Sequence, residues 1–371
     1  MPELVALPAG GGMAFVDALR AVWDDGDAVL PVDPRFPAPT VARLFEALRP
    51  TVVVDEHGQR TRRADGEPVE PGDALVIPTS GSTGVPKGVI HTHASVAASA
   101  RATNGGVGTD PATDRWLCSL PLSHVAGLSV VTRALAAGTP LEVLDGFDAD
   151  AVEAAALAGA TLTTLVPTAL ARIDPSLFRR IVVGGTFPPE ELPANCLVSY
   201  GMTETGSAIA YDGVPLEGVE VRIVDGEIHL RGGMLLRAYR DGRDPKDPDG
   251  WLATDDAGEL VDGRLVVHGR RGDLIITGGE NVWPIEVERV LDLHPAVAEV
   301  AVVGRPDPEW GRTVTAVVVP ADPADPPTLD ALRGLAKDHL PAYAAPRAIE
   351  VVDALPRTPL GKVARRELEP R

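Results

Sequence analysis

The segment from Ile77 to Gly88, IPTSGSTGVPKG, has the composition of a loop that binds phosphate groups. Glycines allow the backbone to approach a ligand closely and to point its N–H groups at phosphate oxygens. The hydroxyl groups donate further hydrogen bonds, and Lys87 supplies a positive charge. In a Walker loop Ser or Thr follows the lysine, whereas Gly88 follows it here. We predict a phosphate loop between an apolar strand and a helix, in preference to a flexible Gly/Ser linker.

Residues 200–205, YGMTET, place an aromatic ring, a hydroxyl and a carboxylate at the end of an apolar strand. Tyr200 can stack on a base, Thr203 can donate a hydrogen bond, and Glu204 is an oxygen ligand of the kind that Mg²⁺ prefers. An ordinary turn at a strand end has the same composition. This segment therefore identifies a site only together with others.

Residues 251–258, WLATDDAG, offer a carboxylate at a strand end. A carboxylate accepts hydrogen bonds only, so it can hold both hydroxyls of a ribose. An acidic surface loop is the alternative interpretation.

Two segments that contain basic residues follow. Residues 269–288, GRRGDLIITGGENVWPIEVE, predict a basic pair, an apolar strand, a Gly-Gly turn and a helix that begins at Pro284. Residues 355–366, LPRTPLGKVARR, place Lys362 after a glycine-led turn. The alternative for Lys362 is a solvated lysine of the tail.

Strands and helices alternate from Ala74 to Tyr200, which indicates an α/β fold of layered sheets. The predicted strands cover residues 74–78, 116–120, 141–144, 161–166, 181–183 and 197–200. The predicted helices cover residues 125–137, 149–157 and about 168–173. Residues 1–72 either complete the sheet or form a shortened lid.

Two further regions are expected. Short strands at 220–224, 227–230, 259–261 and 264–267, with Asp-Gly turns, predict an antiparallel β subdomain over about 211–271. Helices at 284–291 and 329–339 and strands at 297–303, 313–319 and 348–352 predict a small α+β domain. We therefore expect an N-terminal domain of residues 1–271 and a C-terminal domain of residues 272–371.

The composition argues against several classes of protein. A net charge of −19 without a basic stripe argues against a nucleic-acid partner. The two cysteines, Cys118 and Cys196, form neither a disulfide framework nor a zinc motif, which favours a cytoplasmic location. The N-terminus lacks the features of a signal peptide and no apolar run is long enough for a span, so we expect no stable membrane insertion. The oligomeric state stays open, a homodimer included.

In their order along the chain, the five segments resemble those of the acyl-adenylate-forming superfamily, which includes acyl-CoA synthetases, luciferases and the adenylation domains of peptide synthetases. The resemblance runs from about Ala74 to the C-terminus. It implies an enzyme that uses ATP and Mg²⁺ to convert a small carboxylic acid into an acyl-adenylate, and then transfers the acyl group to coenzyme A. It also implies a large N-terminal domain and a small mobile C-terminal domain.

The resemblance assigns roles by position. It implies that Lys362, Glu204 and Thr203 are catalytic and that Glu204 is the Mg²⁺ ligand. Nucleotide contacts fall to Thr79, Ser80, Gly81, Ser82, Thr83, Gly84, Lys87, Gly184, Gly185, Thr186, Ser199, Tyr200, Gly201, Met202, Asp256 and Arg270. Gly272 is the hinge, and Gly278 and Gly279 line the path of the thiol. The family's Thr-Gly-Asp is Thr254-Asp255-Asp256 here, so the choice of Asp256 over Asp255 depends on register.

Only 78 residues precede Thr79, which is fewer than in most relatives. This short form, with SLPLSHVAGLS at 119–129, resembles actinobacterial o-succinylbenzoate–CoA ligases of menaquinone biosynthesis. Their substrate is a dicarboxylate, and Arg133 can pair with the carboxyl that is not activated; the alternative is a surface arginine. His124 matches a position beside the acyl pocket, or it is a helix N-terminal histidine with a structural hydrogen bond.

Other functions stay open. They are another acyl- or aryl-CoA synthetase, a stand-alone enzyme that loads a carrier protein, and a non-enzymatic ATP-binding regulator. The presence of Lys87, Glu204, Asp256 and Lys362 argues against the regulator.

Overall fold

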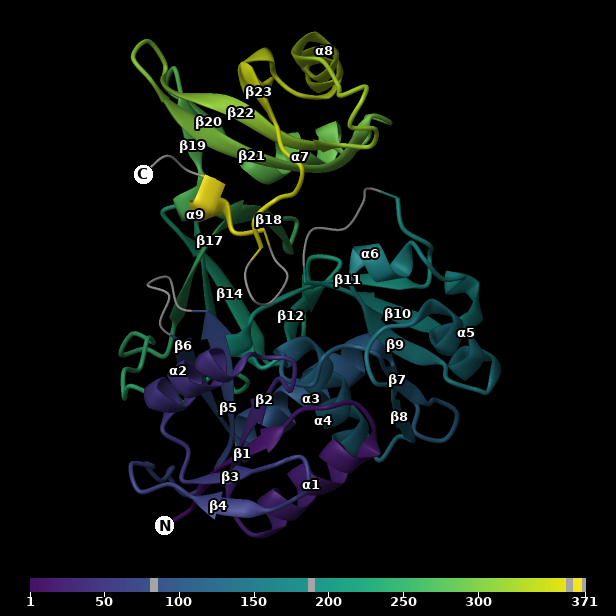
Figure 1. Cartoon of the computed structure of the whole chain (residues 1–371), viewed down its shortest axis with the longest axis vertical. Coiled ribbons are helices and arrows are strands. Elements are labelled where there is room, and N and C mark those ends of the chain that lie inside the picture. Colours follow the sequence, from purple (N-terminus) through teal and green to yellow (C-terminus); the bar gives the residue numbers. More distant parts are fainter. Residues whose placement is uncertain (81–85, 186–190, 358–362, 369–371) are drawn as a thin grey trace. The chain divides into compact units, whose positions relative to one another are not determined.

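The computed structural model describes residues 1–80, 86–185, 191–357 and 363–368 (Figure 1). They divide into two compact units. The first comprises residues 1–222, 229–253 and 261–265, and the second comprises residues 223–228, 254–260 and 266–371. The boundary between them passes through a four-stranded sheet, so the chain changes unit several times there.

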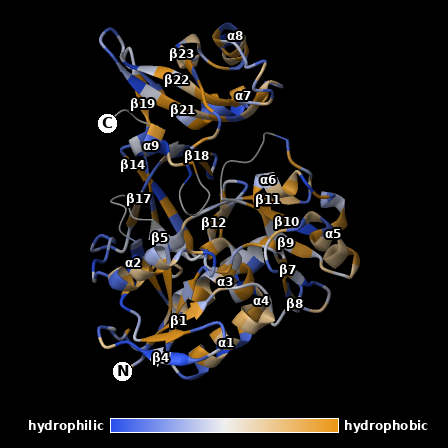
Figure 2. Cartoon of the chain, in the orientation of Figure 1, coloured by the Kyte–Doolittle hydropathy of each residue, from blue (hydrophilic) through white to orange (hydrophobic). Residues whose placement is uncertain are grey.

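The first unit contains a seven-stranded sheet to which the N-terminal residues contribute most strands. Its order is β16-β6-β5-β2-β1-β3-β4. The strands are β1 (Leu4–Pro8), β2 (Ala28–Val32), β3 (Val52–Val54), β4 (Arg60–Arg62), β5 (Asp73–Ser80), β6 (Pro86–Thr92) and β16 (Ala238–Tyr239). Residues 1–72 thus complete the sheet, and the lid interpretation is wrong. The edge strand β4 reads Arg-Thr-Arg and is blue in Figure 2, as expected of a strand edge that must not pair with another chain.

Helices α1 (Met13–Asp24) and α2 (Ala38–Leu48) cover this sheet. α1 contacts β1 and β2 and buries Phe15, Val16, Leu19 and Val22, which share one face of a helix. α2 contacts β6 and buries Leu44 and Leu48. The sequence analysis predicted neither helix.

A second seven-stranded sheet of the first unit has the order β13-β12-β11-β10-β9-β7-β8. Its strands are β7 (Trp116–Cys118), β8 (Leu141–Val143), β9 (Leu162–Leu165), β10 (Arg180–Val183), β11 (Cys196–Gly201), β12 (Ala208–Tyr211) and β13 (Val214–Pro215). β7 to β11 pair in parallel, whereas β12 and β13 are antiparallel additions. The predicted strands of this region are confirmed, as is the predicted helix α5 (Ala149–Leu157); α6 (Pro167–Leu170) is shorter than predicted.

Two helices lie between the sheets. α3 (His93–Val107) contacts β5 and β6 of the first sheet and β12 of the second, and α4 (Val125–Ala137) contacts α3, β7 and β9. Every residue of α4 from Gly127 to Ala134 is buried, as expected of a helix that is covered on all sides. The predicted bounds of α4 are confirmed, whereas the helix predicted after the phosphate loop had no predicted bounds and begins, as α3, only after β6.

The four-stranded sheet has the order β14-β15-β17-β18. Its strands are β14 (Val219–Val224), β15 (Glu227–Gly232), β17 (Leu252–Val261) and β18 (Arg264–Arg270). The Asp-Gly turns between them have positive φ at both residues, 49° and 75° at Asp225–Gly226 and 49° and 77° at Asp262–Gly263. These values fit the tight hairpin turns that the sequence predicts.

The C-terminal part of the second unit is an α+β layer. Its sheet has the order β20-β19-β22-β21, with β23 beside β22. The elements are β19 (Ile275–Thr277), β20 (Glu280–Val282), α7 (Pro284–Leu291), β21 (Val297–Asp307), β22 (Gly311–Pro320), α8 (Leu329–His339), β23 (Ala348–Val351) and α9 (Arg365–Leu368). The predicted bounds of α7 and α8 are confirmed, and both helices pack over one buried cluster with β21 and β22.

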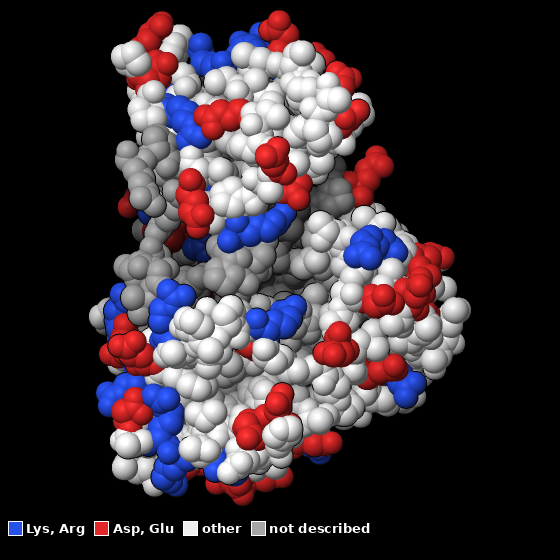
Figure 3. Space-filling model, in the orientation of Figure 1, with Lys and Arg blue, Asp and Glu red and all other residues white. Residues whose placement is uncertain are grey.

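Within the described ranges, no helix combines the length and the apolar composition that a bilayer crossing needs. On the face drawn in Figure 3, acidic and basic side chains are interspersed. Both cysteines are free and buried, as the absence of a cysteine motif predicts.

Candidate active site

The phosphate-loop segment is the tip of a β-hairpin. β5 and β6 pair antiparallel, with Thr79 opposite Lys87, and Ser80 ends β5. The prediction of a helix directly after the loop is wrong, because Pro86–Thr92 forms β6 and α3 begins only at His93. The backbone of β6 finds partners on both sides, in β5 and β16, which favours a strand. The loop residues Gly81, Ser82, Thr83 and Gly84 lie outside the described residues.

Lys87 and Glu204 meet at one aromatic ring. The Lys87 Nζ lies 5.4 Å from the centre of the Tyr239 ring, and the Tyr239 hydroxyl donates a hydrogen bond of 2.9 Å to Oε1 of Glu204. Tyr239 lies in β16, opposite Val89 of β6. The structure therefore brings together two predicted site residues that are more than a hundred positions apart in the sequence. Sequence reasoning missed Tyr239, since nothing local to β16 marks it.

Thr203 and Glu204 lie on a short 3₁₀ turn, η2 (Thr203–Thr205). The Thr203 carbonyl accepts a hydrogen bond of 2.7 Å from Nε2 of His91, a fully buried residue of β6. Burial lowers the pKa of His91 to about 4, so the ring is neutral near pH 7 and its Nε2 carries the proton. His91 was also missed by the sequence analysis. It fixes the turn of Glu204 to the strand of Lys87.

The segments predicted to contact the nucleotide at 184–186 and 199–202 lie at the ends of two adjacent parallel strands, β10 and β11. Gly184 and Gly185 follow β10, and the Ser199 hydroxyl of β11 donates a bond of 3.0 Å to the Val183 carbonyl. A Cβ at Gly184 would overlap the Ser199 Oγ, so a larger residue fits there only if that hydroxyl turns away. Thr186 lies outside the described residues.

Tyr200, Gly201 and Met202 end β11 beside an irregularity in its pairing with β12. A Cβ at Gly201 would lie 2.7 Å from the Cα of Ala208, so glycine is required by the close approach of β12. The Met202 N–H donates to the Thr205 hydroxyl at 3.0 Å, which closes the η2 turn.

In the second unit, Asp256 and Arg270 form an ion pair. Nε of Arg270 lies 2.9 Å from Oδ1 of Asp256, and Nη1 of Arg270 donates to the Thr254 carbonyl at 2.8 Å. Asp256 is buried inside β17, so the prediction of a carboxylate at a strand end, and its alternative of a surface loop, are both wrong. Asp255 is exposed and has a φ of 59°, whereas Asp256 lies on the buried side of β17 with Leu252 and Thr254.

Arg133 is buried, with 2% of its surface exposed, so the alternative of a surface arginine is wrong. Its Nη2 donates to the hydroxyls of Ser129 at 2.8 Å and Ser207 at 3.0 Å, and its Nη1 to that of Thr164 at 3.4 Å. Its guanidinium lies 5.2 Å from the centre of the Trp116 ring. No described carboxylate pairs with Arg133, and its Nε has no described hydrogen-bond partner.

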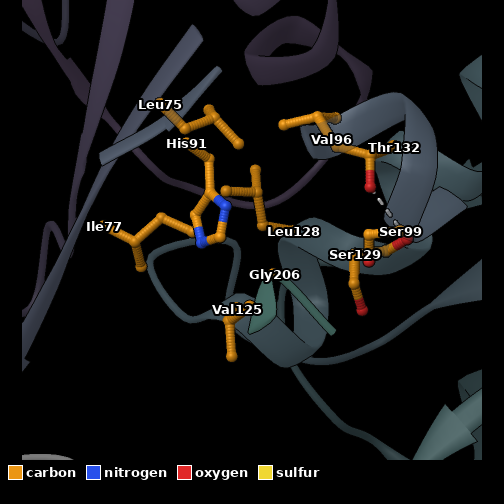
Figure 4. Close-up of a pocket in the computed structure, with 10 residues that line it drawn as sticks. All are labelled: Leu75, Ile77, His91, Val96, Ser99, Val125, Leu128, Ser129, Thr132 and Gly206. Carbon is orange, nitrogen blue, oxygen red and sulfur yellow. Dashed lines mark hydrogen bonds between the residues drawn. The ribbon is translucent and has the colours of Figure 1, made fainter. Parts of the chain in front are cut away.

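A small cavity is lined in part by Ser129, the hydroxyl of which accepts a hydrogen bond from Arg133 (Figure 4). Its lining includes Ser129 and Thr132 of α4, Leu75 and Ile77 of β5, and His91. Its volume is about 10 Å³, which is the size of one water molecule. A larger ligand therefore requires side chains to move. His124 is the N-cap of α4, and its side chain makes no capping hydrogen bond to the helix.

The remaining predicted residues lie in the second unit. Gly272 is in a 3₁₀ turn, η3 (Arg271–Asp273), and a Cβ there would meet no atom within 4 Å. Gly278 and Gly279 form the turn between β19 and β20, with φ of 58° and 87°. A Cβ at Gly278 would lie 2.7 Å from the indole of Trp310, whose other contact is the Arg347 guanidinium at 3.8 Å from its ring centre.

Lys362 lies outside the described residues. Arg365, three positions later, forms an ion pair with the buried Glu288 of α7 and donates to the Val302 carbonyl at 2.9 Å. These contacts fix the chain shortly after Lys362.

The described residues hold no group of three or more His, Cys, Asp and Glu side chains that is placed to bind a metal. Mg²⁺ is commonly held by one or two carboxylates together with nucleotide phosphates. A single carboxylate, Glu204, beside the cation Lys87 fits a metal that arrives with a nucleotide.

Comparison with known proteins agrees with this geometry. The family model "AMP-binding enzyme" matches residues 55–240, and its companion "AMP-binding enzyme C-terminal domain" matches residues 286–362. A probable 2-succinylbenzoate–CoA ligase of Mycobacterium tuberculosis is 39% identical over 333 residues, which are 82% of this chain and 85% of the relative.

Among solved structures, o-succinylbenzoate CoA synthetase of Bacillus subtilis in complex with the acyl-adenylate intermediate is 29% identical, with a TM-score of 0.86. The match covers 100% of this chain and 88% of that one. The same enzyme in complex with ATP and magnesium ion has a TM-score of 0.87 at 29% identity, over 99% of this chain and 89% of that one. The chain belongs to the AMP-binding enzyme family.

Proposed function

We propose that the chain is an ATP-dependent acid–CoA ligase that converts o-succinylbenzoate, ATP and CoA into o-succinylbenzoyl-CoA, AMP and pyrophosphate, a step of menaquinone biosynthesis. The names of its relatives support the reaction. The observation that supports this substrate is Arg133, a buried cation that has no described carboxylate partner and donates a hydrogen bond to Ser129, a residue that lines the small cavity.

In the first half-reaction, a carboxylate oxygen of the acid attacks the α-phosphorus of ATP. The bond from that phosphorus to the bridging oxygen breaks, and pyrophosphate leaves with the electron pair. Both reactants are anions, so positive charge is needed to bring them together. Lys362 is proposed to contact the acyl carboxylate and the α-phosphate, and Lys87, with the loop 79–84, the leaving pyrophosphate. Mg²⁺ held by Glu204 would supply further positive charge.

The nucleoside is proposed to lie against the ends of β10 and β11. Gly184 and Gly201 let the chain pack closely there, since a Cβ at either position would meet Ser199 or Ser207, and Tyr200 offers a ring. Asp256 is proposed to accept the ribose hydroxyls beside the Arg270 guanidinium.

In the second half-reaction, the thiol of CoA loses its proton to solvent and attacks the carbonyl carbon of the acyl-adenylate. The bond to the phosphate oxygen breaks and AMP leaves with the electron pair. We propose that residues 272–371 rotate about Gly272 between the two steps, which withdraws Lys362. Free space around Gly272 is consistent with a hinge. Gly278 and Gly279 are proposed to line the path of the thiol.

The substrate of this reaction has two carboxyl groups, and only one is activated. We propose that the second pairs with Arg133, with His124 nearby at the start of α4. A buried guanidinium that contacts only hydroxyls and a ring has lost water without gaining a counter-charge. A carboxylate supplies that counter-charge in the bidentate geometry that arginine favours.

The other functions are a ligase for another aryl or acyl acid, and an enzyme that loads a carrier protein. Neither gives Arg133 a carboxylate unless its acid also carries a second acidic group. A location in the cytoplasm and a homodimer are further expectations from the sequence.

The test is pyrophosphate release with ATP, Mg²⁺ and a panel of acids, in the presence and absence of CoA. We expect o-succinylbenzoate to give the highest kcat/KM and benzoate and fatty acids to give little activity. Activity on those acids with none on o-succinylbenzoate would overturn the substrate and leave the reaction class standing. Pyrophosphate release that does not depend on any acid would overturn the reaction itself.

A further inference from the structure

Tyr239 is anchored in the first sheet by backbone hydrogen bonds on each side of it. The N–H of Arg237 donates to the Ile90 carbonyl at 2.8 Å, and the N–H of Arg240 donates to the Gly88 carbonyl at 2.7 Å. The N–H of Tyr239 donates to the Arg243 carbonyl at 2.9 Å. Its side chain is 9% exposed. The ring therefore has a fixed position relative to β6, which carries Lys87.

Glu204 is tied to the same segment twice. Its backbone carbonyl accepts from the N–H of Leu236 at 2.8 Å, and its Oε1 accepts from the Tyr239 hydroxyl at 2.9 Å. A glutamate side chain has several rotatable bonds, and a hydrogen bond to a fixed donor selects one of its orientations. The second oxygen, Oε2, is then the one directed elsewhere.

The face of the same ring is close to positive charge. The Lys87 Nζ lies 5.4 Å and the Arg243 guanidinium 5.0 Å from its centre, within the range of cation–π attraction. In the described part of the chain, Lys87 and Glu204 form no ion pair with each other. The hydroxyl of Tyr239 thus holds the carboxylate, and its ring attracts the lysine.

We propose that Tyr239 is a positioning residue for magnesium-bound ATP: it holds Glu204 in the orientation that binds the metal and keeps Glu204 apart from Lys87. This inference rests on the proposed function of Glu204 as the metal ligand. Without the hydroxyl, Glu204 is free to turn toward the positive charges at the ring, and it can pair with Lys87. That pairing would occupy the metal ligand and neutralise the phosphate-binding cation together.

The test is Tyr239→Phe, which removes the hydroxyl and keeps the ring. The dissociation constant of ATP is measured by calorimetry on the whole protein, with excess Mg²⁺ and again with a chelator, in the absence of acid and CoA. We expect the dissociation constant with Mg²⁺ to rise about tenfold, which is the loss of about 1.4 kcal/mol, and the constant without Mg²⁺ to rise by a smaller factor, because free ATP loses only the contact with Lys87. A structural role alone would weaken both equally, and that result would overturn the inference, as would an unchanged constant with Mg²⁺.

Two further variants keep the outcomes distinct. Tyr211→Phe is the matched control, because the Tyr211 hydroxyl is buried and has no described hydrogen-bond partner; we expect no change in either constant. Glu204→Gln should abolish the effect of Mg²⁺ on ATP binding. If Glu204→Gln leaves that effect intact, the proposed metal ligand is wrong. If Glu204→Gln abolishes it and Tyr239→Phe does not weaken it, only the role of Tyr239 is wrong.

Discussion

At the scale of residues, a substitution of Arg133 tests the proposed recognition of o-succinylbenzoate directly. Arg133→Met removes the charge and keeps most of the volume, so it separates recognition from packing. We expect the KM for o-succinylbenzoate to rise tenfold or more, because a hydrogen bond between charged groups is worth about 1.5–3 kcal/mol. Steady-state pyrophosphate release measures it.

The control for Arg133→Met is a change of substrate. 4-Oxo-4-phenylbutanoate has the same activated carboxyl and lacks the aryl carboxyl, so its KM should hardly differ between wild type and variant. If the KM rises equally for both acids, Arg133 supports the fold of the pocket and does not recognise the second carboxyl.

His91 makes stability depend on pH. Its pKa is lowered by burial to about 4, below the ordinary 6.5, so the unfolded chain takes up a proton at a higher pH than the folded one. Its contribution is complete above pH 6.5 and is lost as the pH falls toward 4. We expect a loss on the order of 2 kcal/mol between pH 7.5 and pH 5.

Urea unfolding of wild type and His91→Gln at several pH values isolates this contribution. Glutamine keeps a donor for the Thr203 carbonyl but does not titrate. The difference between the two free energies of unfolding should shrink as the pH falls. If the free energies of unfolding of the two proteins change with pH in parallel, His91 is not the group that titrates.

At the scale of elements, the chain packs closely where Gly184, after β10, meets Ser199 of β11. A Cβ at Gly184 would overlap the Ser199 Oγ, while its next nearest atom lies at 3.7 Å. We expect Gly184→Ala to raise the KM for ATP several-fold, because the Ser199 hydroxyl must turn away and lose its hydrogen bond to the Val183 carbonyl. Adding Ser199→Ala should restore most of the loss, since the hydroxyl is the obstacle.

The double variant Gly184→Ala with Ser199→Ala is compared with both single variants in a cycle. Additive effects on the KM for ATP would contradict the steric explanation, and Ser199 would then matter only through its bond to Val183.

Elements that the sequence predicts well carry a local signal. α4, α7 and α8 have the predicted bounds because apolar spacing, Pro284 and the Thr328 cap mark them. The bounds of α3 were not predicted because its residues are small and weakly amphipathic, which suits a helix between two sheets but looks like a loop. β6 was missed because a phosphate loop suggests a following helix, and β16 because two residues become a strand only through pairing with β6.

The residues of the site also divide into those that a local sequence pattern marks and those that it does not. Motifs identify Lys87, Glu204 and Asp256 because chemistry needs those residue types in that order along the chain. Tyr239 and His91 act on residues more than thirty and more than a hundred positions away, and no local pattern encodes such contacts.

At the scale of the whole molecule, a single substitution should affect the two half-reactions differently. Lys362→Ala is expected to slow adenylate formation by roughly 10²–10³-fold or more, because it removes a charge that stabilises the transition state. It should leave thioester formation from supplied acyl-adenylate and CoA nearly unchanged. Single-turnover measurement of each step checks this.

If Lys362→Ala slows both half-reactions equally, the lysine does not act in the first and withdraw before the second. Arg365→Ala is a useful companion, because it removes the ion pair with Glu288 that fixes the chain after Lys362. It should impair adenylate formation more than thioester formation.

The contact between Gly278 and Trp310 has a spectroscopic consequence. Light emission from an indole depends on the charges and the solvent around it, and this one lies between a bare backbone turn and the Arg347 guanidinium. The turn is where we propose that the thiol of CoA arrives. The protein therefore carries a natural fluorophore at that point, and the difference between wild type and Trp310→Phe would isolate its signal from those of the other four tryptophans.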